Sequence, residues 1–340
     1  IQSSPAQQFF NKRDALHSFF SMLTSVAEVN GKYYCTGYCW DSINYIGNNQ
    51  AWGIEGVKFA VFDTYGNKII DTIYQKNGKD IAAANGKLLP QPDGSFLLAA
   101  DETDTNGKWY LNIMRFDTTG KVIWEKEFPK PLCTDVSPND DFWRLLDFQP
   151  DSFGNWLMLS TIVCGTPGNG IQHDMFLMKL DSSFNLIWQK QYGYPNMNDY
   201  AGKLLIEHDG YILAGGRSNS NLVRKNFIFN AEMYKVDTSG NHLWHWLSDG
   251  QKKIGTIKDV IRTQDGGYLY CGMGDGYEVL SANQSFSIPE FKGWVEKIDL
   301  NRNVLWNKTI NDEYSNWPST EQRMLMELPD GKAVVAGSLW

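Results

Sequence analysis

The chain repeats one pattern five times: an aliphatic strand that runs into Asp, a tight turn, two apolar residues and, in four copies, Trp. The copies read VKFAVFDTYGNKII at 57–70, LNIMRFDTTGKVIW at 111–124, DMFLMKLDSSFNLIW at 174–188, AEMYKVDTSGNHLW at 231–244 and WVEKIDLNRNVLW at 294–306. Such repetition indicates one supersecondary unit copied along the chain. It constrains the fold more than any other feature of this sequence.

The spacing within the pattern is constant. In every copy the repeat Asp precedes the last apolar residue by seven positions. The repeat Asp residues are Asp63, Asp117, Asp181, Asp237 and Asp299, and the residues seven positions later are Ile70, Trp124, Trp188, Trp244 and Trp306. Gly-marked turns from Gly31 to Gly331 enclose five repeats in 300 positions, a mean period of 60. That length suits four short strands, the size of one β-propeller blade.

Strand signals fill each repeat. β-Branched and aromatic residues stand in runs that Gly, Asn and Asp interrupt, and Asp-Gly pairs favour tight hairpins. We therefore predict an all-β fold, a β-propeller of four-stranded blades with about six visible. The predicted blades are 18–74, 84–130, 142–193, 200–249, 255–311 and 320–340, the last of them incomplete.

The ends of the chain leave two interpretations of blade closure. Residues 320–340 supply only two strands, and an unfinished blade would expose an unpaired edge. Either the N-terminal segment 1–17 helps to close that blade as a strap, or the natural polypeptide continues, with a seventh blade as one outcome. We favour continuation, with 18–340 as the propeller region.

The repeat residues have predicted structural roles. The Asp side chain can accept backbone N–H bonds in the turn while Gly66, Gly120 or Gly240 takes the left-handed conformation. Phe184 and Arg302 stand in that Gly position in two blades, so we expect those turns to be strained or differently shaped. The Trp series is expected to fill wedges between twisted sheets. Stacking platforms that face a channel are the alternative, and their place within regular strands argues against it.

Composition excludes several function classes. The chain is 42% hydrophobic with a net charge of −8, which argues against nucleic-acid or anionic-membrane binding, because phosphate contacts need clustered Lys and Arg. No apolar run approaches the roughly 20 residues of a membrane helix. Among five cysteines, Cys35 and Cys271 align with small core residues. A Cys35–Cys39 or a Cys133–Cys164 disulfide is compatible with an exported protein.

Catalytic and metal motifs are sparse. The five histidines are scattered, and neither a nucleophile elbow nor a phosphate loop is present. An acidic segment resembles half of a calcium loop, and its oxygen-bearing residues are Asp101, Glu102, Asp104 and Asn106. An EF-hand is excluded because Ile113 stands where the final Glu would be. Calcium there is one interpretation and a solvated acidic turn is the other; we expect no other cofactor.

Long loops join the second and third strands of each predicted blade, and all of them should emerge at one edge. They are rich in Asn, Ser, Gly and aromatic residues, which suits adaptable hydrogen bonding with ring anchors. The alternative is that they are variable polar connections. The residues that we predict to contact a ligand are Trp40, Tyr45, Trp52, Trp109 and Tyr277.

The phrases DGGYLYCG and GWVEKIDLNRNVLWNKTIND, with DGYILAGG and DGSFLLAA, resemble repeats of secreted β-propeller proteins of the Bacteroidota, over about residues 18–340. Many such proteins resemble cargo of the type IX secretion system and carry a C-terminal sorting domain, which is not visible here. FDTTGKVIW at 116–124 is more weakly similar to pyrroloquinoline-quinone-type propeller repeats. That family includes quinoprotein dehydrogenases and a non-enzymatic outer-membrane assembly scaffold, and nothing here matches its quinone site.

These resemblances imply an exported protein at the cell surface or outer membrane. We expect a non-catalytic binding or scaffold module that recognises a protein or glycan partner through loops on one edge, within a secretion or outer-membrane complex as one setting. The alternative is a propeller-fold glycoside hydrolase or lyase, which would need two carboxyl groups about 5 to 10 Å apart on one face.

Overall fold

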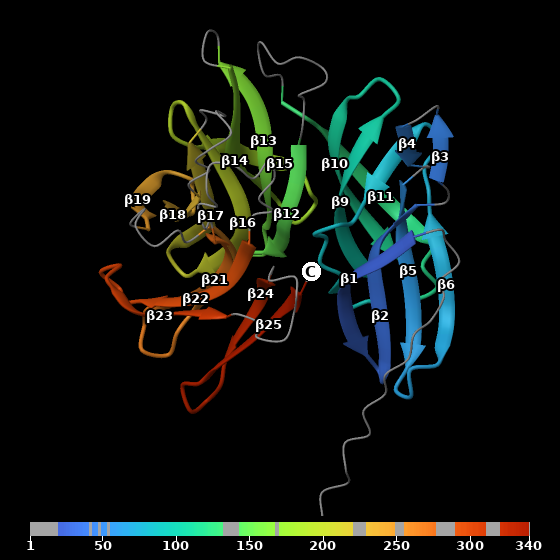
Figure 1. Cartoon of the computed structure of the whole chain (residues 1–340). Helices are drawn as coiled ribbons and strands as arrows, with labels where there is room; N and C mark the ends of the chain where they lie inside the picture. The colour runs from blue at the N-terminus through green and yellow to red at the C-terminus, as the bar shows by residue number, and fades with distance from the viewer. Residues whose placement is uncertain are drawn as a thin grey trace, which may run out of the picture. The chain divides into compact units, whose positions relative to one another are not determined.

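The structure is a computed structural model of the chain (Figure 1). It describes residues 20–40, 43–46, 49–52, 55–131, 143–166, 170–219, 229–248, 255–276, 290–310 and 320–339. Every regular element in these ranges is a β-strand. The chain divides into two compact units, Ile1–Pro131 and Leu132–Trp340, and each is described by itself.

The first unit contains two antiparallel blades. The first blade has the strand order β1-β2-β5-β6, with a hairpin of β3 and β4 between its second and third strands. Its strands are β1 (Phe20–Val29), β2 (Lys32–Trp40), β3 (Ile43–Ile46), β4 (Asn49–Trp52), β5 (Glu55–Asp63) and β6 (Lys68–Tyr74). In the second blade, two short strands both pair with β9 and together replace a continuous first strand. Its strands are β7 (Lys79–Ala82), β8 (Leu89–Pro90), β9 (Phe96–Asp104), β10 (Trp109–Phe116) and β11 (Val122–Pro129).

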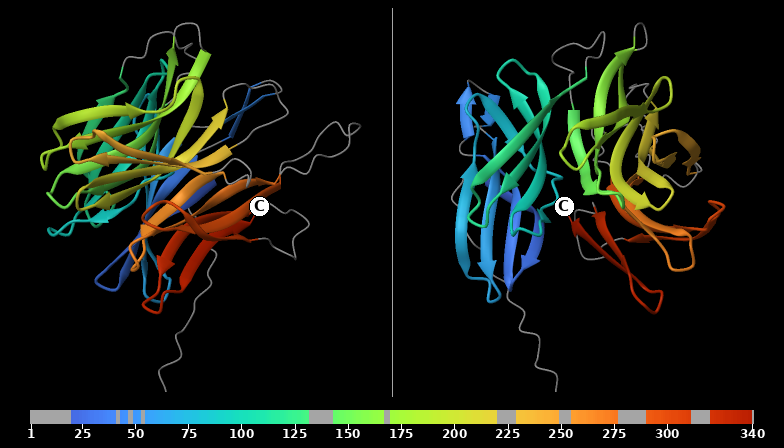
Figure 2. Two further views of the ribbon diagram at one scale, coloured as in Figure 1. Left: turned by 90° about the vertical axis from the view of Figure 1, so that its left-hand side faces the viewer. Right: turned by 180° about the vertical axis from the view of Figure 1, so that it is seen from behind.

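The second unit contains three four-stranded blades and a two-stranded sheet, each with its strands in sequence order (Figure 2). The third blade is β12 (Trp143–Pro150), β13 (Trp156–Thr166), β14 (Gly170–Leu180) and β15 (Leu186–Tyr192). The fourth is β16 (Met197–Glu207), β17 (Gly210–Asn219), β18 (Phe229–Asp237) and β19 (His242–Leu247). The fifth is β20 (Thr256–Arg262), β21 (Tyr268–Gly276), β22 (Glu290–Ile298) and β23 (Val304–Ile310), and the last sheet is β24 (Thr320–Glu327) and β25 (Ala333–Leu339).

The prediction of an all-β fold built from β-propeller blades is confirmed. Five blades carry the four-strand pattern, against about six predicted, because the sheet of β24 and β25 has two strands in the described part of the chain. The predicted closure strap at residues 1–17 lies outside the described residues.

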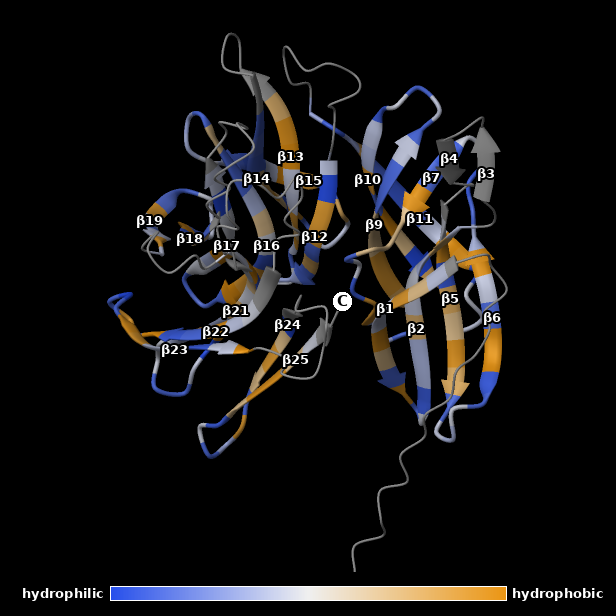
Figure 3. Ribbon diagram, viewed as in Figure 1, coloured by the Kyte–Doolittle hydropathy of each residue, from blue (hydrophilic) through white to orange (hydrophobic). Residues whose placement is uncertain are grey.

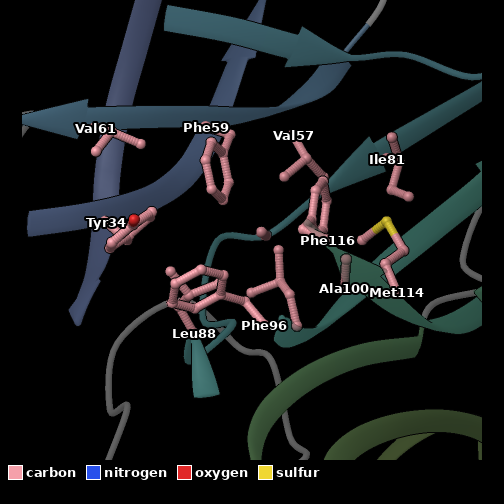
Figure 4. Packing of buried hydrophobic residues seen from close by; sticks show 12 residues of the cluster. Tyr34, Val57, Phe59, Val61, Ile81, Leu88, Phe96, Ala100, Met114 and Phe116 are labelled. Atoms are coloured by element: carbon pink, nitrogen blue, oxygen red, sulfur yellow. The ribbon is translucent and has the colours of Figure 1, made fainter. Parts of the chain in front are cut away.

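Hydrophobic cores lie between successive blades within each unit. In the first unit, Phe59 stacks on Phe116 with ring centroids 5.6 Å apart, and Tyr34, Val57 and Phe96 pack around them (Figure 4). In the second unit, each interface is likewise closed by residues from two neighbouring blades. Figure 3 shows the apolar residues along the strands and polar ones at the turns. Burial of this apolar surface is the main force that joins one blade to the next.

The repeat Asp closes the turn between the third and fourth strands. Asp237 Oδ1 accepts the amides of Ser239 and Asn241, each at 2.8 Å, and Asn241 Nδ2 donates to Oδ2 at 3.0 Å. These bonds lower the pKa of the Asp237 carboxyl because they favour its ionised form. The equivalent carboxylates of the other four blades also accept turn amides.

Phe184 and Arg302 adopt the same left-handed conformation as the glycines that they replace, with φ of 62° and 69° against 77° at Gly240. The turn therefore keeps its shape, and the strain falls on these two residues. Their side chains find aromatic partners. Phe184 stacks on Trp156 with centroids 5.6 Å apart, and the Arg302 guanidinium lies 5.0 Å from the centre of the Trp244 ring.

A β-bulge interrupts the first strand at the same place in five sheets, namely β1, β12, β16, β20 and β24. In three of them, the residue after the bulge accepts a backbone amide of the next blade. These bonds are Leu88 N to Ser25 Oγ at 2.9 Å, Leu204 N to Asp147 Oδ2 at 3.1 Å and Leu325 N to Asp259 Oδ2 at 2.8 Å. Bulge and acceptor together fix how adjacent blades are aligned.

Lys203 links the first strands of the second unit. It occupies the position after the bulge in β16, and its Nζ lies 3.1 Å from Asp147 Oδ2. Burial disfavours its charge, but the carboxylates of Asp147 and Asp259 outweigh burial and raise the pKa of Lys203. The bulge residue itself must be small, because a Cβ on Gly202 would lie 2.0 Å from the carbonyl oxygen of Ile257 in the next blade.

We predict that Asp147→Ala lowers the free energy of unfolding by about 3 kcal/mol, because it leaves the buried Leu204 amide without an acceptor and Lys203 without its carboxylate. Urea denaturation at pH 7 measures the loss. Asp147→Asn is the matched control: it keeps an oxygen for the Leu204 amide and should lose about half as much. Equal losses in the two variants would contradict a role for this hydrogen bond.

Candidate functional site

Two edges of each blade differ in their connections. The antiparallel strand order places the ends of the second and fourth strands together with the start of the third, so the long connections leave from one edge. We call this the loop edge. The opposite edge, the turn edge, carries the tight Asp-containing turns. The loop edge collects the polar side chains described next.

A buried cluster of charged side chains lies at the loop edge between the third and fourth blades. Its centre is Arg217 near the end of β17, whose Nε donates to Asp199 Oδ1 of β16 at 2.7 Å. The same guanidinium donates to Glu232 of β18 and, at 2.8 Å, to the hydroxyl of Tyr234. His245 Nε2 of β19 lies 2.7 Å from Glu232 Oε1. Asp199 and Glu232 are fully buried.

The third blade and the connection that follows it complete the cluster. The ring of Tyr194 lies under the Arg217 guanidinium, 4.4 Å from its centre, and the Tyr194 amide donates to Asp199 Oδ2 at 2.9 Å. Asp174 of β14 accepts hydrogen bonds from Gln172 at 3.1 Å and Gln191 at 2.5 Å. Tyr194 therefore ties the connection that follows the third blade to β16 and β17 of the fourth, whereas the hydrogen bonds of Asp174 stay within the third blade.

The cluster contains more acid than base. Burial and the neighbouring Glu232 raise the pKa of Asp199 to about 7, and burial with the charge of Asp199 raises that of Asp174 to about 6. Burial also raises the pKa of Glu232. Burial and the Arg217 charge lower the pKa of His245 to about 4, so its imidazole is neutral at pH 7. One guanidinium thus faces three carboxyl groups.

A second charged cluster lies at the loop edge between the first and second blades. Glu102, Asn112 and Glu125 stand at the register positions that Arg217, Glu232 and His245 hold in the fourth blade. The Asn112 amide donates to Glu102 at 2.9 Å and to Glu125 at 3.1 Å.

Two lysines neutralise the carboxylates of this second cluster. Lys76 Nζ lies 3.4 Å from Glu102 and 3.2 Å from Glu125 and also pairs with Glu127. Lys79 pairs with Glu102 and, at 2.7 Å, with Glu127. Burial opposes ionisation of Glu125 and Glu127, but hydrogen bonds and the lysine charges outweigh it and lower both pKa values.

The predicted ligand-contact residues map to the loop edge wherever the structure describes them. Trp40 ends β2 half-buried, with its ring 5.7 Å from that of Tyr38 in an edge-on arrangement. Trp109 begins β10, also half-buried. The backbones of Tyr45 and Trp52 lie in β3 and β4 of the hairpin. Tyr277 lies outside the described residues.

The acidic segment considered for calcium makes protein contacts. Asp104 Oδ1 accepts the amides of Asn106 at 2.8 Å and Lys108 at 3.0 Å, as in a closed turn. Glu102 pairs with the lysines of the second cluster, and Asp101 is buried in β9. Within the ranges that the structure describes, no three His, Cys, Asp or Glu side chains gather so as to hold a metal ion. Calcium binding at this segment stays a prediction.

The repeat Trp residues occupy equivalent positions in the fourth strands. Trp188 and Trp244 are half-buried, and their rings lie 6.5 Å from Tyr211 and 6.4 Å from Tyr268, both in the following blade. Trp124 and Trp306 are more exposed; Trp124 lies in the last blade of the first unit, and Trp306 in the blade before the two-stranded sheet.

Sequence reasoning missed the polar pairs within the third and fourth strands. Five positions before the repeat Asp, a polar residue interrupts an otherwise apolar buried strand, and eight positions after it stands its partner. The pairs are Lys58 with Asp71, Asn112 with Glu125, and Glu232 with His245. Alignment of the repeats on their Asp residues carries this signal.

Cys164 is disulfide-bonded, whereas Cys35, Cys39 and Cys271 keep their thiols. The prediction of a Cys35–Cys39 disulfide is therefore wrong. The other alternative involves Cys133, which lies outside the described residues. Burial raises the pKa of the Cys35 thiol to about 11, as expected for a core residue. In the described ranges there is no helix long and apolar enough to cross a membrane.

No protein-family profile and no curated protein matches the chain. Among solved structures, it is similar to a neuraminidase-like protein from A/bat/Guatemala/164/2009, with 9% identity, a TM-score of 0.49 and coverage of 95% of this chain and 82% of that one. It is also similar to an ACO/RPE65 chimera, at 13% identity and a TM-score of 0.46, with 87% of this chain covered and 64% of the chimera's length. A structure named glycoside hydrolase gives 11% identity, a TM-score of 0.41 and coverage of 79% and 90%. Likenesses of this size carry no argument about function, and the resemblance to secreted Bacteroidota propellers stays a prediction.

We predict that Lys76→Met lowers the free energy of unfolding by about 3 kcal/mol at pH 7, because the buried Glu102 loses one of its two cations. Glu125 and Glu127 have folded pKa values below their unfolded value of about 4.3, so their contribution is present above that pH and is lost as the pH falls further. The difference between wild type and variant should therefore shrink at pH 3.5. Thermal unfolding at the two pH values measures it.

Lys121→Met, at an exposed lysine on the turn edge of the same blade, is the control and should change little at either pH. A Lys76→Met loss of the same size at pH 7 and pH 3.5 would argue against the ionic origin of the effect.

Proposed function

We propose that this protein is a non-catalytic binding or scaffold module that recognises a protein or glycan partner through the loop edges of its blades. One observation carries the proposal: the loop-edge carboxylates are committed to partners within the protein. Asp199, Glu232 and Glu102 are fully buried, and each forms an ion pair within the protein, the first two with Arg217 and the third with Lys76 and Lys79. Carboxyl groups paired and buried in this way hold strand ends together and are not exposed to a substrate.

Aromatic side chains supply contact area at the same edge. Trp40 and Tyr38 pack edge-on at the end of β2, and Trp109 begins β10 next to Tyr110, whose ring lies 4.3 Å from Lys79 Nζ. Half-buried aromatic rings lose little conformational freedom on binding and are common among residues that dominate interfaces. Paired strands therefore hold these ring anchors at the loop edge.

The cellular location of the protein is proposed from two other observations. The disulfide of Cys164 suits an oxidising compartment. With the resemblance of the repeats to secreted Bacteroidota propellers, this supports export to the cell surface or outer membrane, where a type IX secretion complex is one candidate setting. Mass spectrometry of material that copurifies with the native protein would identify the partner.

We predict that Trp40→Ala and Trp109→Ala each weaken binding of the copurified partner at least about tenfold, which corresponds to about 1.4 kcal/mol. Each change removes a ring at the loop edge while leaving the strand pairing in place. Isothermal titration calorimetry with the purified partner gives the dissociation constants.

The matched control is Tyr65→Ala, because Tyr65 is an aromatic residue 68% exposed on the turn edge of the same blade as Trp40. This variant should bind within twofold of wild type. Wild-type affinity in both tryptophan variants, or an equal loss in the tyrosine variant, would rule out the loop edge as the binding surface.

A glycoside hydrolase or lyase is the second candidate, and the raised pKa values of Asp174 and Asp199 favour it, because a general acid must hold its proton near neutral pH. If Asp199 is that acid, Asp199→Asn should lower the rate on a panel of aryl glycosides at least about 100-fold. If wild type does not hydrolyse these glycosides, or if Asp199→Asn hydrolyses them as fast as wild type, Asp199 is not a general acid. Neither result affects the binding proposal.

A further inference from the structure

Where the fourth blade meets the third, three buried carboxyl groups lie near a single guanidinium. Among the described residues, the ionisable groups that face each other there come from five strands and one connection. They are Asp174 of β14, Asp199 of β16, Arg217 of β17, Glu232 and Tyr234 of β18, His245 of β19, and Tyr194 between β15 and β16. Arg217 is the one permanent cation in that set.

The contacts between Asp199 and Glu232 require a proton. Arg217 donates to Asp199 Oδ1 and to Glu232 Oε1, so one guanidinium holds both carboxyl groups side by side. The two carboxyl groups also interact with each other, and two carboxylates have no hydrogen to share. Glu232 Oε2 is buried and receives no hydrogen bond from any donor as the side chains stand. A proton on Asp199 would be donated to this oxygen and would remove one of the two adjacent negative charges.

We propose that Asp199 and Glu232 form a proton-held latch at the loop edge of the fourth blade, closed while the pair shares a proton and loosened when the proton leaves. In the closed state Arg217 neutralises the single remaining charge of the pair, and each carboxyl oxygen has a donor. In the loosened state two buried carboxylates face one guanidinium, so the ends of β16, β17 and β18 that carry these three side chains open more easily. This inference does not depend on what the loop edge binds.

The direction of the pH effect follows from the pKa of Asp199. Its folded value of about 7 lies above its unfolded value of about 3.9, so the closed state binds more protons than the open state between these limits. The stabilisation is complete below about pH 4 and is lost as the pH rises through 7. Deprotonation of Asp174 has an effect in the same direction over a lower pH range, because the pKa of Asp174 in the folded protein is about 6.

The first unit provides an internal comparison. The equivalent interface between the first and second blades brings three glutamates together with two lysines, and the pKa values of Glu125 and Glu127 are lowered. Glu125 and Glu127 are therefore ionised at pH 6 and pH 7. At this loop edge the second blade carries glutamates paired with lysines, where the fourth blade has two carboxyl groups that share one guanidinium.

Hydrogen exchange of the full chain tests the latch, with rates corrected for intrinsic base catalysis. In wild type, we expect the opening equilibrium of amides in β16 and β18 to rise about fivefold between pH 6 and pH 7, the change that release of one proton with this midpoint gives. Amides of β9 and β10 should change less than twofold. Asp199→Asn supplies a permanent amide donor to Glu232, so the rise should fall to about twofold or less.

Two further variants keep the test decisive. Glu232→Gln removes the second charge by a different change and should flatten the pH dependence in the same way, which covers the case in which Asp199→Asn folds poorly. Glu125→Gln, at the matched interface of the first unit, should leave the fivefold rise intact. A fivefold rise that survives both Asp199→Asn and Glu232→Gln, or one that is equally large in β9 and β10, would overturn the latch.

Discussion

Neighbouring blades in this protein are aligned by a hydrogen bond that the β-bulge of the first strand makes available. After the bulge, Ser25, Asp147 and Asp259 each accept a backbone amide of the next blade. A slip of one residue would leave a buried amide and a buried carboxylate without partners, so these contacts specify alignment more strictly than apolar packing can. This alignment of the blades sets the positions of the side chains in the two loop-edge clusters.

The two loop-edge clusters use the same positions with different balances of charge. Between the first and second blades, Lys76 pairs with Glu125 and Lys79 with Glu127, and the pKa values of both carboxyl groups are lowered. Where the fourth blade meets the third, Arg217 alone faces three carboxyl groups, and burial together with the neighbouring carboxylates raises the pKa values of Asp199 and Asp174. One architecture thus gives a joint that is insensitive to pH near neutrality and another that responds to it. Burial increases the difference in pKa between the carboxyl groups of the two clusters, because charges interact more strongly away from water.

Sequence reasoning succeeded where contacts are local. The Asp237 turn was predicted from its composition, since both amides that it binds lie within four residues. Trp40 and Trp109 were placed at the loop edge because strand order alone decides which ends share an edge. Sequence reasoning missed Glu232, although aligning the repeats on their Asp residues pairs it with His245, and it missed Arg217, because a polar residue in a predicted second strand gives no sign of its partners. For Phe184 and Arg302 it left two alternatives open, and backbone geometry decided between them.

The sequence by itself determined the strands, their turns and the repeat, because periodic apolar residues and Asp-containing turns act within a few positions of each other. Only the tertiary structure decided which charges meet. Asp199 reaches Arg217 across 18 positions, and Tyr211 reaches Asp151 of the preceding blade across 60. The protonation of Asp199 depends on burial and on the number of neighbouring charges, and both of these exist only once two blades are packed together.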